Sequence, residues 1–394
     1  KPMWAVIIPL LGQSWGNTFG TLAAAWDALA MSAGLSAGSK EYLITAFWTA
    51  LFIWFWNMII GMTICWFYGK GKAIRKGFLA VVLLSVIQGG GELLLTQVNT
   101  TIACFVPACI SLIAILLLGR LPAFRKEWSV EDSRVMERGK DTQETEEKPE
   151  GMTLLHAFVP YILLSVIALV VLLVEPVHTL LSKVQIGFSF PETVTGYGYV
   201  NEAVESFSPW TPFTHASMFL FVSAVIGMIY YKKKGWIQKG GIGRIFVRAV
   251  SMTMPSGMAI IGLVIMSKIM AGTGQTEVLA NGIAGVLGKV YVILSPFIGL
   301  LGSFMTGSNM SSNILFAGFQ STTANLLNVD PSIVLGAQSS GGSIGSAISP
   351  SNIVLGTTTA NILGSEGKVL RKIIVITVPA ALMIGVFVLA LTSL

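Results

Sequence analysis

Long apolar runs separated by short polar segments dominate the pattern of hydrophobic and polar positions along the chain. Such runs cover residues 42–68, 99–119, 154–174, 213–231, 249–267 and 373–393. Each reaches or approaches the ~20 residues that a helix needs to cross the hydrocarbon core of a bilayer. Because a helix satisfies its own backbone polar groups within lipid, the pattern predicts an all-α integral membrane protein built as a multi-span helical bundle.

Two polar, glycine-rich stretches interrupt the pattern in the second half. One reads GAQSSGGSIGSAISPSNIVLGTT over 336–358, where eleven of 23 residues are glycine or serine, and the other reads TGSNMSSN over 306–313. We predict a re-entrant hairpin over 278–328 with its tip at 306–313, followed by one interrupted helix over 331–364. Irregular backbone is tolerated at membrane depth only where it is buried in protein or lines a water-filled cavity.

Composition and charge support this interpretation and add an orientation. The chain is 53% hydrophobic and only 11% charged, against about 25% charged in soluble domains. Lysine and arginine cluster at 69–76, 230–248 and 368–372, whereas 175–212 contains Lys183 as its single basic residue. Since Lys/Arg-rich loops stay inside, we expect the clusters in the cytoplasm and 175–212 outside.

A charged segment divides the chain in two. Residues 120–150 hold seven Lys/Arg and nine Asp/Glu with almost nothing to bury, as expected of a solvated linker. We predict a first transmembrane repeat over 1–119, a cytoplasmic linker over 120–152 and a second repeat over 153–394. The chain begins at Lys1 inside an apolar context, so we expect further helices upstream.

The interruptions carry chemistry suited to a small anion. Ser349-Pro350 and Ser308-Asn309 are typical helix starts, and a helix N-terminus offers free N–H groups and about half a positive charge. Serine and asparagine can also bond a hydroxyl group. We therefore predict a site for a small hydroxy carboxylate, although glycines such as Gly341 could serve only close helix packing.

An earlier pair of stretches echoes the later pair. LGQSWGNTFGTLAAAW (11–26) is similar to 305–320, and QGGGELLLTQVNTT (88–101) is similar to 338–352, in the same order. Interrupted segments at corresponding places indicate a secondary transporter built from two repeats, whether inverted or not. The predicted substrate-binding residues are Ser14, Asn17, Thr18, Gln88, Ser308, Asn309, Ser312, Asn313, Gln338, Ser339, Ser349 and Asn352. Gln88 and Gln338 could instead bond the freed backbone groups of the broken helices.

Few residues suggest other chemistry. Glu92 is the one acid well inside a predicted membrane segment, which makes it the candidate proton-coupling residue, unless it simply reaches water at a break. Cys65, Cys104 and Cys109 lack the spacing of a metal site. We expect no metal, no cofactor beyond coupling protons, no catalytic residue and no nucleic-acid partner.

Four stretches resemble signature segments of the L-lactate permease family. They are SWGNTFGTLA (14–23), SPFIGLLGSFMTGSNMSSNILFAGFQ (295–320), GAQSSGGSIGSAISPSNIVLGTTTA (336–360) and EGKVLRK (366–372). The resemblance implies a secondary transporter of a bacterial or archaeal cytoplasmic membrane that carries L-lactate, D-lactate or glycolate with protons. Another small organic anion or Na⁺ coupling stays open, and the oligomeric state is not predicted.

Two further classes of function deserve comparison. An anion channel could use the same broken helices. An intramembrane hydrolase would use Ser339 or Ser340 as nucleophile and His215 as base, but no motif brings that histidine within reach of either serine.

Overall fold

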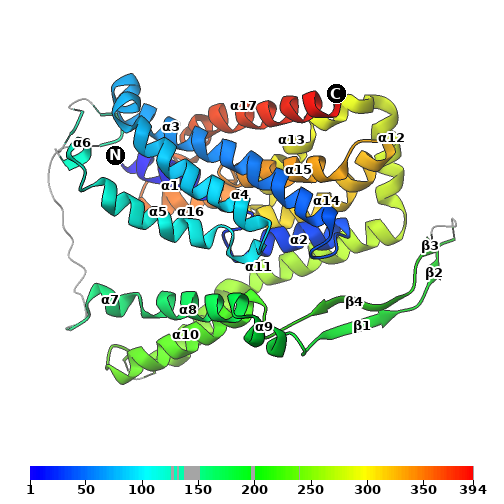
Figure 1. Cartoon of the computed structure of the whole chain (residues 1–394), viewed down its shortest axis with the longest axis horizontal. Helices are drawn as coiled ribbons and strands as arrows, with labels where there is room; N and C mark the ends of the chain where they lie inside the picture. Colours follow the sequence, from blue (N-terminus) through cyan, green and yellow to red (C-terminus); the bar gives the residue numbers. More distant parts are fainter. Residues whose placement is uncertain (126–127, 131–132, 137–150, 197–199, 239, 394) are drawn as a thin grey trace. The chain divides into compact units, whose positions relative to one another are not determined.

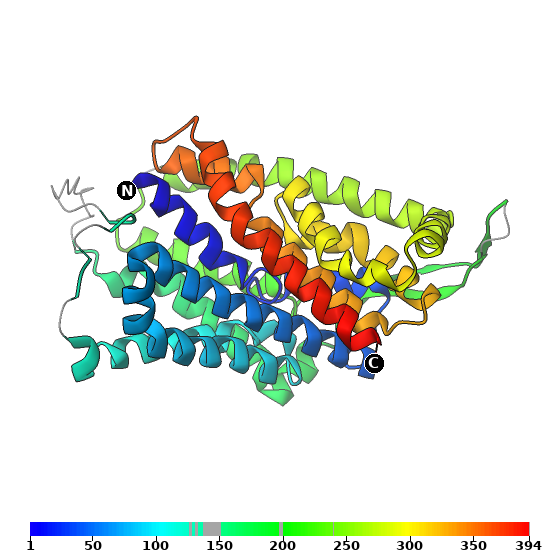
Figure 2. The same cartoon turned by 90° about the horizontal axis from the view of Figure 1, so that it is seen from above.

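The chain forms two compact, mostly helical units in the computed structural model, which describes residues 1–125, 128–130, 133–136, 151–196, 200–238 and 240–393. The first unit comprises Lys1–Arg138 and Leu263–Leu394, and the second comprises Gly139–Gly262. Figures 1 and 2 show the helices in two views.

The N-terminal part of the first unit is a series of helices with two irregular turns. Its elements are α1 (Pro2–Ser14), α2 (Ala24–Ala33), α3 (Lys40–Ser85), a π-helical turn (Val86–Gly90), α4 (Gly91–Thr96), a 3₁₀ turn (Thr100–Ile102), α5 (Phe105–Leu118) and α6 (Pro122–Arg125). The C-terminal part follows helix α11 (Gly241–Gly272), which begins in the second unit. Its elements are α12 (Gln275–Leu287), a 3₁₀ turn (Gly288–Ile293), α13 (Ser295–Thr306), α14 (Asn309–Leu326), α15 (Pro331–Ser346), α16 (Pro350–Thr359) and α17 (Glu366–Ser393).

Helix α3 is two helical arms joined by a reversal. Gly69 and Lys70 leave helical geometry, and Lys70 has a φ of +50°. The arms pack against each other, because a methyl group at Gly61 would lie 2.5 Å from a methyl of Val81. The reversal falls in the basic stretch between two apolar runs, where the sequence predicts a loop.

Among the residues that the structure describes, five helical stretches are long and apolar enough to cross a membrane, or six if the bent pair Val159–Leu173 and Glu175–Leu181 counts as one span. The five are Lys40–Thr96, Thr100–Leu118, Ala216–Lys233, Gln275–Ile293 and Glu366–Ser393. Large apolar side chains cover the outside of these helices, for example Leu116 at 65% and Val375 at 68% exposure. A lipid-facing surface requires such an exterior.

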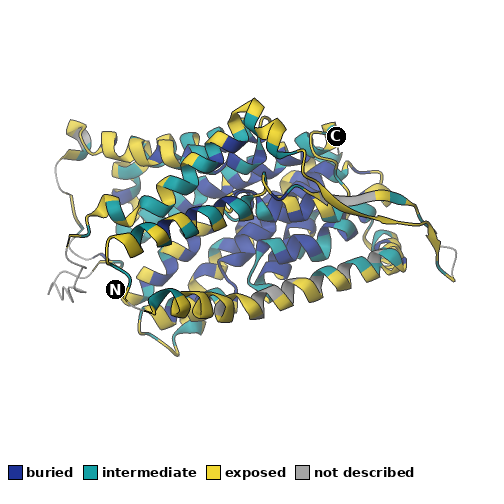
Figure 3. Ribbon diagram, turned by 90° about the horizontal axis from the view of Figure 1, so that it is seen from below, coloured by how far each residue is buried: buried dark blue, intermediate teal, exposed yellow. Residues whose placement is uncertain are grey.

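The polar helix α15 lies at the centre of the first unit. Every residue from Ser332 to Ser346 is buried, and buried residues gather inside the bundle in Figure 3. Glycines permit this packing, since a methyl group at Gly341 would lie 1.9 Å from the carbonyl oxygen of Pro296 on α13. Small residues commonly allow such close approach between membrane helices.

The second unit contains strands that the all-α prediction misses. Besides the start of α11, its helices are α7 (Leu154–Ala157), α8 (Val159–Leu173), α9 (Glu175–Leu181) and α10 (Ala216–Lys233). Strand β1 (Ile186–Phe190) pairs antiparallel with β4 (Val204–Trp210), and β2 (Thr193–Val194) pairs with β3 (Val200–Asn201). Aromatic and β-branched residues in these stretches favour extended backbone, and the described strands form two two-stranded ladders, not a closed sheet.

Other aspects of the predicted organisation stay predictions. These are the two-repeat architecture with its boundaries, the re-entrant path of 278–328 and the membrane crossing by 331–364. Residues 137–150 of the proposed linker lie outside the described residues.

Candidate functional site: three helix breaks meet in the first unit

Two of the breaks are followed by helices that start where the sequence predicts helix starts. Gly307 ends α13 in the left-handed conformation at φ +79°, and the Ser308 side chain then accepts a hydrogen bond from the backbone N–H of Ser311 at 3.4 Å. Ser349 occupies the N-cap of α16 in extended backbone, with Pro350 as its first helical residue. Both helix starts are therefore confirmed.

The first of the three breaks in chain order separates α1 from α2 over residues 15–23, so the breaks before α14 and α16 are the second and the third. Leu22 and Ala23 have φ values of +50° and +63°, a conformation that costs a non-glycine residue about 1–2 kcal/mol. Gly20 fits tightly, because a methyl group there would lie 2.1 Å from the carbonyl oxygen of Gly16. The tertiary contacts of this segment hold it in a shape that its residues do not prefer locally.

The first break contacts one face of α15. Thr18 Oγ1 lies 2.8 Å from Ser343 Oγ and 3.2 Å from Ser339 Oγ, and the Asn17 amide donates to Ser346 Oγ. The three serines are spaced four and three residues apart, which places them on one side of a helix. Residues predicted from the two halves of the chain thus meet.

Two asparagines on α14 complete this Ser/Asn cluster, which we define as Asn17, Thr18, Asn309, Asn313, Ser339, Ser343 and Ser346. Asn309 Nδ2 donates to Thr18 Oγ1 at 2.9 Å and to Ser343 Oγ at 3.2 Å. Asn313 Nδ2 donates to the carbonyl oxygen of Ala25 at 2.9 Å and to Ser339 Oγ at 3.0 Å. Both side chains are almost fully buried.

Three buried oxygen atoms beside these contacts lack a hydrogen-bond partner: Asn309 Oδ1, Asn313 Oδ1 and Ser303 Oγ. The carbonyl of Ala25 requires an N–H group, so it fixes the orientation of the Asn313 amide and leaves Oδ1 as an unused acceptor. An unsatisfied buried polar group costs about 1–3 kcal/mol. Such acceptors match a ligand that brings O–H donors.

The other two breaks adjoin each other. Asn352 Nδ2 donates to the carbonyl oxygens of Ser346 at 2.9 Å and Gly307 at 3.3 Å. A methyl group at Gly307 would lie only 2.3 Å from Ser351 Oγ. The N-termini of α14 and α16 are therefore neighbours, and the first N–H groups of each have no intrahelical acceptor.

A glutamine network braces the same helices. Gln338 Nε2 donates to Ser312 Oγ at 3.2 Å, and its Oε1 accepts from Gln320 Nε2 at 2.9 Å. Gln320 also accepts from the hydroxyl of Tyr291, and Ser312 donates to the carbonyl oxygen of Gly299 at 2.9 Å. These contacts favour a bracing role for Gln338 and Ser312, the alternative that the sequence leaves open for Gln338.

The hydrogen bonds of Ser14 and Gln88 lead away from the cluster. Ser14 Oγ donates to the carbonyl oxygen of Leu11 at 2.6 Å and accepts from Trp56 Nε1 at 2.8 Å. Gln88 lies in the π-helical turn and accepts from Asn57 Nδ2 at 2.9 Å. Both contacts brace α3, and neither joins these residues to the serines of α15.

Glu92 is buried, with 0% of its surface exposed, on the short helix α4. Neither carboxylate oxygen accepts a hydrogen bond of normal geometry, and the thiol of Cys104 is a polar neighbour. A methyl group at Gly16 would lie 3.6 Å from the Cys104 sulfur. The carboxylate thus lies behind the first break instead of reaching water.

A cavity of about 430 Å³ lies between α1 and α16 and has Asn352 and Gln13 in its wall. Of the residues predicted to bind substrate, Asn352 lines this cavity. Sequence reasoning missed Gln13, Ser303, Gln320, Ser343 and Ser346. The helical spacing from Ser339 could have indicated Ser343 and Ser346, whereas Gln13 and Ser303 carry no comparable signal.

The residues of the hydrolase alternative have other partners. His215 caps α10 and its ring contacts Ser217 Oγ at 2.8 Å, while Ser340 Oγ donates to the carbonyl oxygen of Gly336 at 2.7 Å. Within the described residues, no group of three or more His, Cys, Asp or Glu side chains could hold a metal ion.

Comparison with known proteins supplies the family. The sequence model of the L-lactate permease family matches residues 1–394. Glycolate permease GlcA of Escherichia coli (strain K12) is 32% identical over 179 residues, covering 45% of this chain and 31% of that protein. An L-lactate permease of Streptococcus iniae is 24% identical over 335 residues, covering 84% of this chain and 64% of that protein.

The aligned parts thus span less than two thirds of these relatives. No solved structure matches the chain. The family model extends over the whole chain and agrees with the resemblance carried by the sequence of the helix breaks, so the chain belongs to the L-lactate permease family.

Proposed function

We propose that the protein is a secondary active transporter that carries L-lactate and related 2-hydroxy monocarboxylates, such as D-lactate and glycolate, together with protons across the cytoplasmic membrane. The supporting observation is the meeting of three helix breaks around buried asparagine oxygens that lack donors. The substrates named for the glycolate and lactate permeases among its relatives belong to the same chemical class.

In this proposal the carboxylate lies at the adjoining N-termini of α14 and α16. Free N–H groups and helix dipoles stabilise an anion there without a fixed cation. The 2-hydroxyl group donates to Asn313 Oδ1 or Asn309 Oδ1, the acceptors that have no partner. A carboxylate without the hydroxyl would leave these acceptors unsatisfied and bind more weakly.

Entry and exit require the Ser/Asn cluster to open. In the observed conformation Thr18 and Asn17 contact Ser343 and Ser346 directly. We place one route to the site along the cavity between α1 and α16, because its wall includes Asn352 at the third break. Opening at the contact between the first break and α15 would let substrate replace side-chain hydrogen bonds with its own.

Proton coupling removes the electrical cost of accumulating an anion. Moving one negative charge inward against an inside-negative potential costs about 2.3 kcal/mol per 100 mV. Glu92 is the proposed carrier of the coupling proton, since buried membrane carboxylates commonly serve in proton relays and Cys104 connects it to the first break. The substrate carboxyl group itself is the alternative proton carrier.

Reconstitution into liposomes tests the proposal. An inward proton gradient should drive saturable uptake of labelled L-lactate above the rate in protein-free liposomes, whereas a Na⁺ gradient at symmetric pH should not. Glycolate should compete well, and propionate, which lacks the hydroxyl, should compete poorly. Uptake driven by Na⁺ alone, or equal competition by propionate, would contradict the proposal.

Counterflow separates a carrier from a channel. Liposomes loaded with unlabelled lactate should transiently accumulate labelled lactate from outside, because a carrier exchanges one substrate molecule for another. With the membrane potential clamped at zero by K⁺ and valinomycin, a channel would only dissipate the gradient, so uptake without a transient overshoot would favour the channel.

A further inference from the structure

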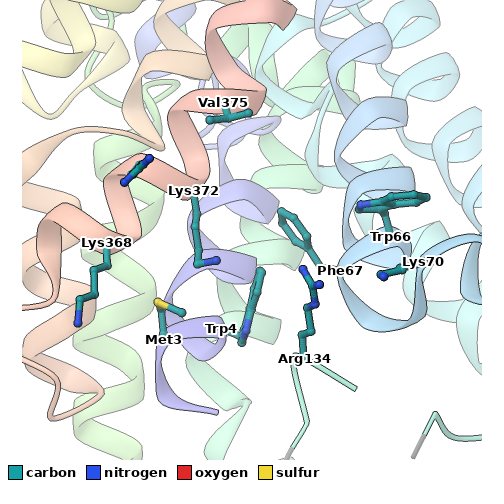
Figure 4. Close-up of a pocket in the computed structure, with 10 residues that line it drawn as sticks. Met3, Trp4, Trp66, Phe67, Lys70, Arg134, Lys368, Lys372 and Val375 are labelled. Carbon is teal, nitrogen blue, oxygen red and sulfur yellow. The ribbon is translucent and has the colours of Figure 1, made fainter. Parts of the chain in front are cut away.

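A second cavity, of about 540 Å³, lies in the first unit and has a strongly basic wall. Figure 4 shows its lining side chains, which come from α1, the end of the first arm of α3 and its reversal, the segment after α6, and α17. The basic residues are Lys70, Arg134, Lys368, Arg371 and Lys372. No acidic side chain is among the described residues that line it.

The sequence brings these cations together in a simple way. Lys368, Arg371, Lys372 and Val375 recur at helical spacing and thus share one face of α17. Lys70 lies at the reversal of α3, and Arg134 belongs to the charged segment that follows α6. Like charges gathered in one concavity repel each other, and they attract an anion that can contact several of them at once.

The floor of the cavity is aromatic. Trp4 is 5% exposed and its ring centroid lies 4.6 Å from that of Phe67. The ammonium group of Lys372 lies 5.1 Å from the centre of the Trp4 ring, within cation–π range. The cavity thus combines a cationic wall with an apolar floor.

The same cavity marks a boundary between polar and apolar surface. Trp66 is 53% exposed and Val375 is 68% exposed at its edge. Beyond Lys372, α17 continues as an apolar candidate span to Ser393. Tryptophan and basic side chains at such a boundary are typical of the headgroup layer of a membrane.

We propose that this cavity binds the phosphate headgroup of an anionic phospholipid. Arginine provides paired N–H donors for phosphate oxygens, and basic pockets between membrane helices are suited to anionic headgroups. The exposed apolar edge offers a surface for the acyl chains. A soluble phosphate shares the headgroup chemistry but makes no use of this edge, and a monocarboxylate offsets one of five charges.

Lipid titration of the purified, delipidated protein tests the site. Native mass spectrometry should show retention of phosphatidylglycerol and cardiolipin, with little retention of phosphatidylcholine at the same concentration. The Lys368→Gln/Arg371→Gln variant should bind anionic lipid on the order of twentyfold more weakly, about fivefold per charge removed. The matched variant Lys232→Gln/Lys233→Gln removes two exposed lysines from α10, outside the cavity wall, and should bind as wild type does.

Several results would overturn the proposal. They are equal retention of neutral and anionic lipid, equal loss of binding in the two double variants, and full displacement of the lipid by inorganic phosphate at matched concentration. The last result would assign the cavity to a soluble anion. Unfolding temperatures in lipid-free detergent verify that both variants fold. If the double variant does not fold, the single exposed substitution Lys368→Gln replaces it, with Lys232→Gln as its control.

Discussion

Asn313 illustrates how single side chains define the proposed site. Its amide nitrogen is committed to a backbone carbonyl oxygen of Ala25 and to Ser339 Oγ, while its oxygen has no donor. Asn309 has the same asymmetry, with both contacts made through its nitrogen. The cluster therefore has spare acceptors, which a hydroxy acid can satisfy and a plain carboxylate cannot.

Replacing Asn313 with alanine should reduce discrimination in favour of the hydroxyl group. A neutral hydrogen bond contributes about 1 kcal/mol, so the apparent affinity for L-lactate should fall roughly fivefold while that for propionate changes little. Competition assays in liposomes measure both affinities. Asn281→Ala on the exposed face of α12 is the control, and an equal loss for both acids would place the hydroxyl elsewhere.

Replacing Glu92 with glutamine should uncouple transport from the proton gradient. Glutamine has nearly the same shape but cannot carry a titrating proton, so gradient-driven accumulation should fall to the level of protein-free liposomes. Counterflow at symmetric pH should persist, which shows that the variant still folds and binds substrate. The exposed Glu277→Gln on α12 should behave as wild type, and retained accumulation in Glu92→Gln would exclude this residue as an obligatory carrier.

At the scale of elements, the contact between α13 and α15 depends on the absence of side chains. Methyl groups at Gly341 and Gly345 would lie 1.9 Å and 2.3 Å from the carbonyl oxygens of Pro296 and Leu300, and one at Gly299 would lie 2.0 Å from that of Gln338. These contacts favour close helix packing as the role of the glycines, which is the simpler alternative that the sequence offers for Gly341. Packing in turn sets the distance between the breaks.

Gly341→Ala should therefore destabilise the protein, whereas Gly282→Ala should not. The first substitution forces two helices apart and should cost about 2 kcal/mol or more, lowering the unfolding temperature in detergent. A methyl group at Gly282 on α12 has nothing within 4 Å, so helix propensity should make that variant neutral or slightly more stable. Equal unfolding temperatures would mean that the α13–α15 interface readily yields.

From local signals in the sequence, the starts of helices were predicted better than the tertiary contacts between them. Ser308 and Ser349 start helices as predicted because capping depends on neighbouring residues. The pairing of Thr18 with Ser343 depends on residues 325 positions apart, and the similarity between the two halves indicated it only in outline. The π-helical turn at Gln88 and the strands of 186–210 were missed, because tertiary context decides them.

At the scale of the whole molecule, two of the basic clusters and the charged segment after α6 converge. Lys70, Arg134 and Lys368 come from regions that the charge distribution assigns separately to the cytoplasmic side, and they line one cavity in the first unit. Their proximity supports the prediction that the three residues lie on the same side of the membrane. The position of the hairpin at 186–210 outside the membrane stays a prediction from the scarcity of basic residues in 175–212.

Cysteine labelling in intact cells tests this orientation. In a transport-active background with Cys65 and Cys109 replaced by alanine and the buried Cys104 retained, an impermeant maleimide should label Thr193→Cys on strand β2 from outside. Lys72→Cys and Lys368→Cys should react only after the membrane is permeabilised, because both lie in basic segments expected inside. Labelling of both lysine positions from outside would invert the topology. Labelling of the two from opposite sides would be incompatible with a single cavity lined by Lys70 and Lys368, and thus also with the lipid site.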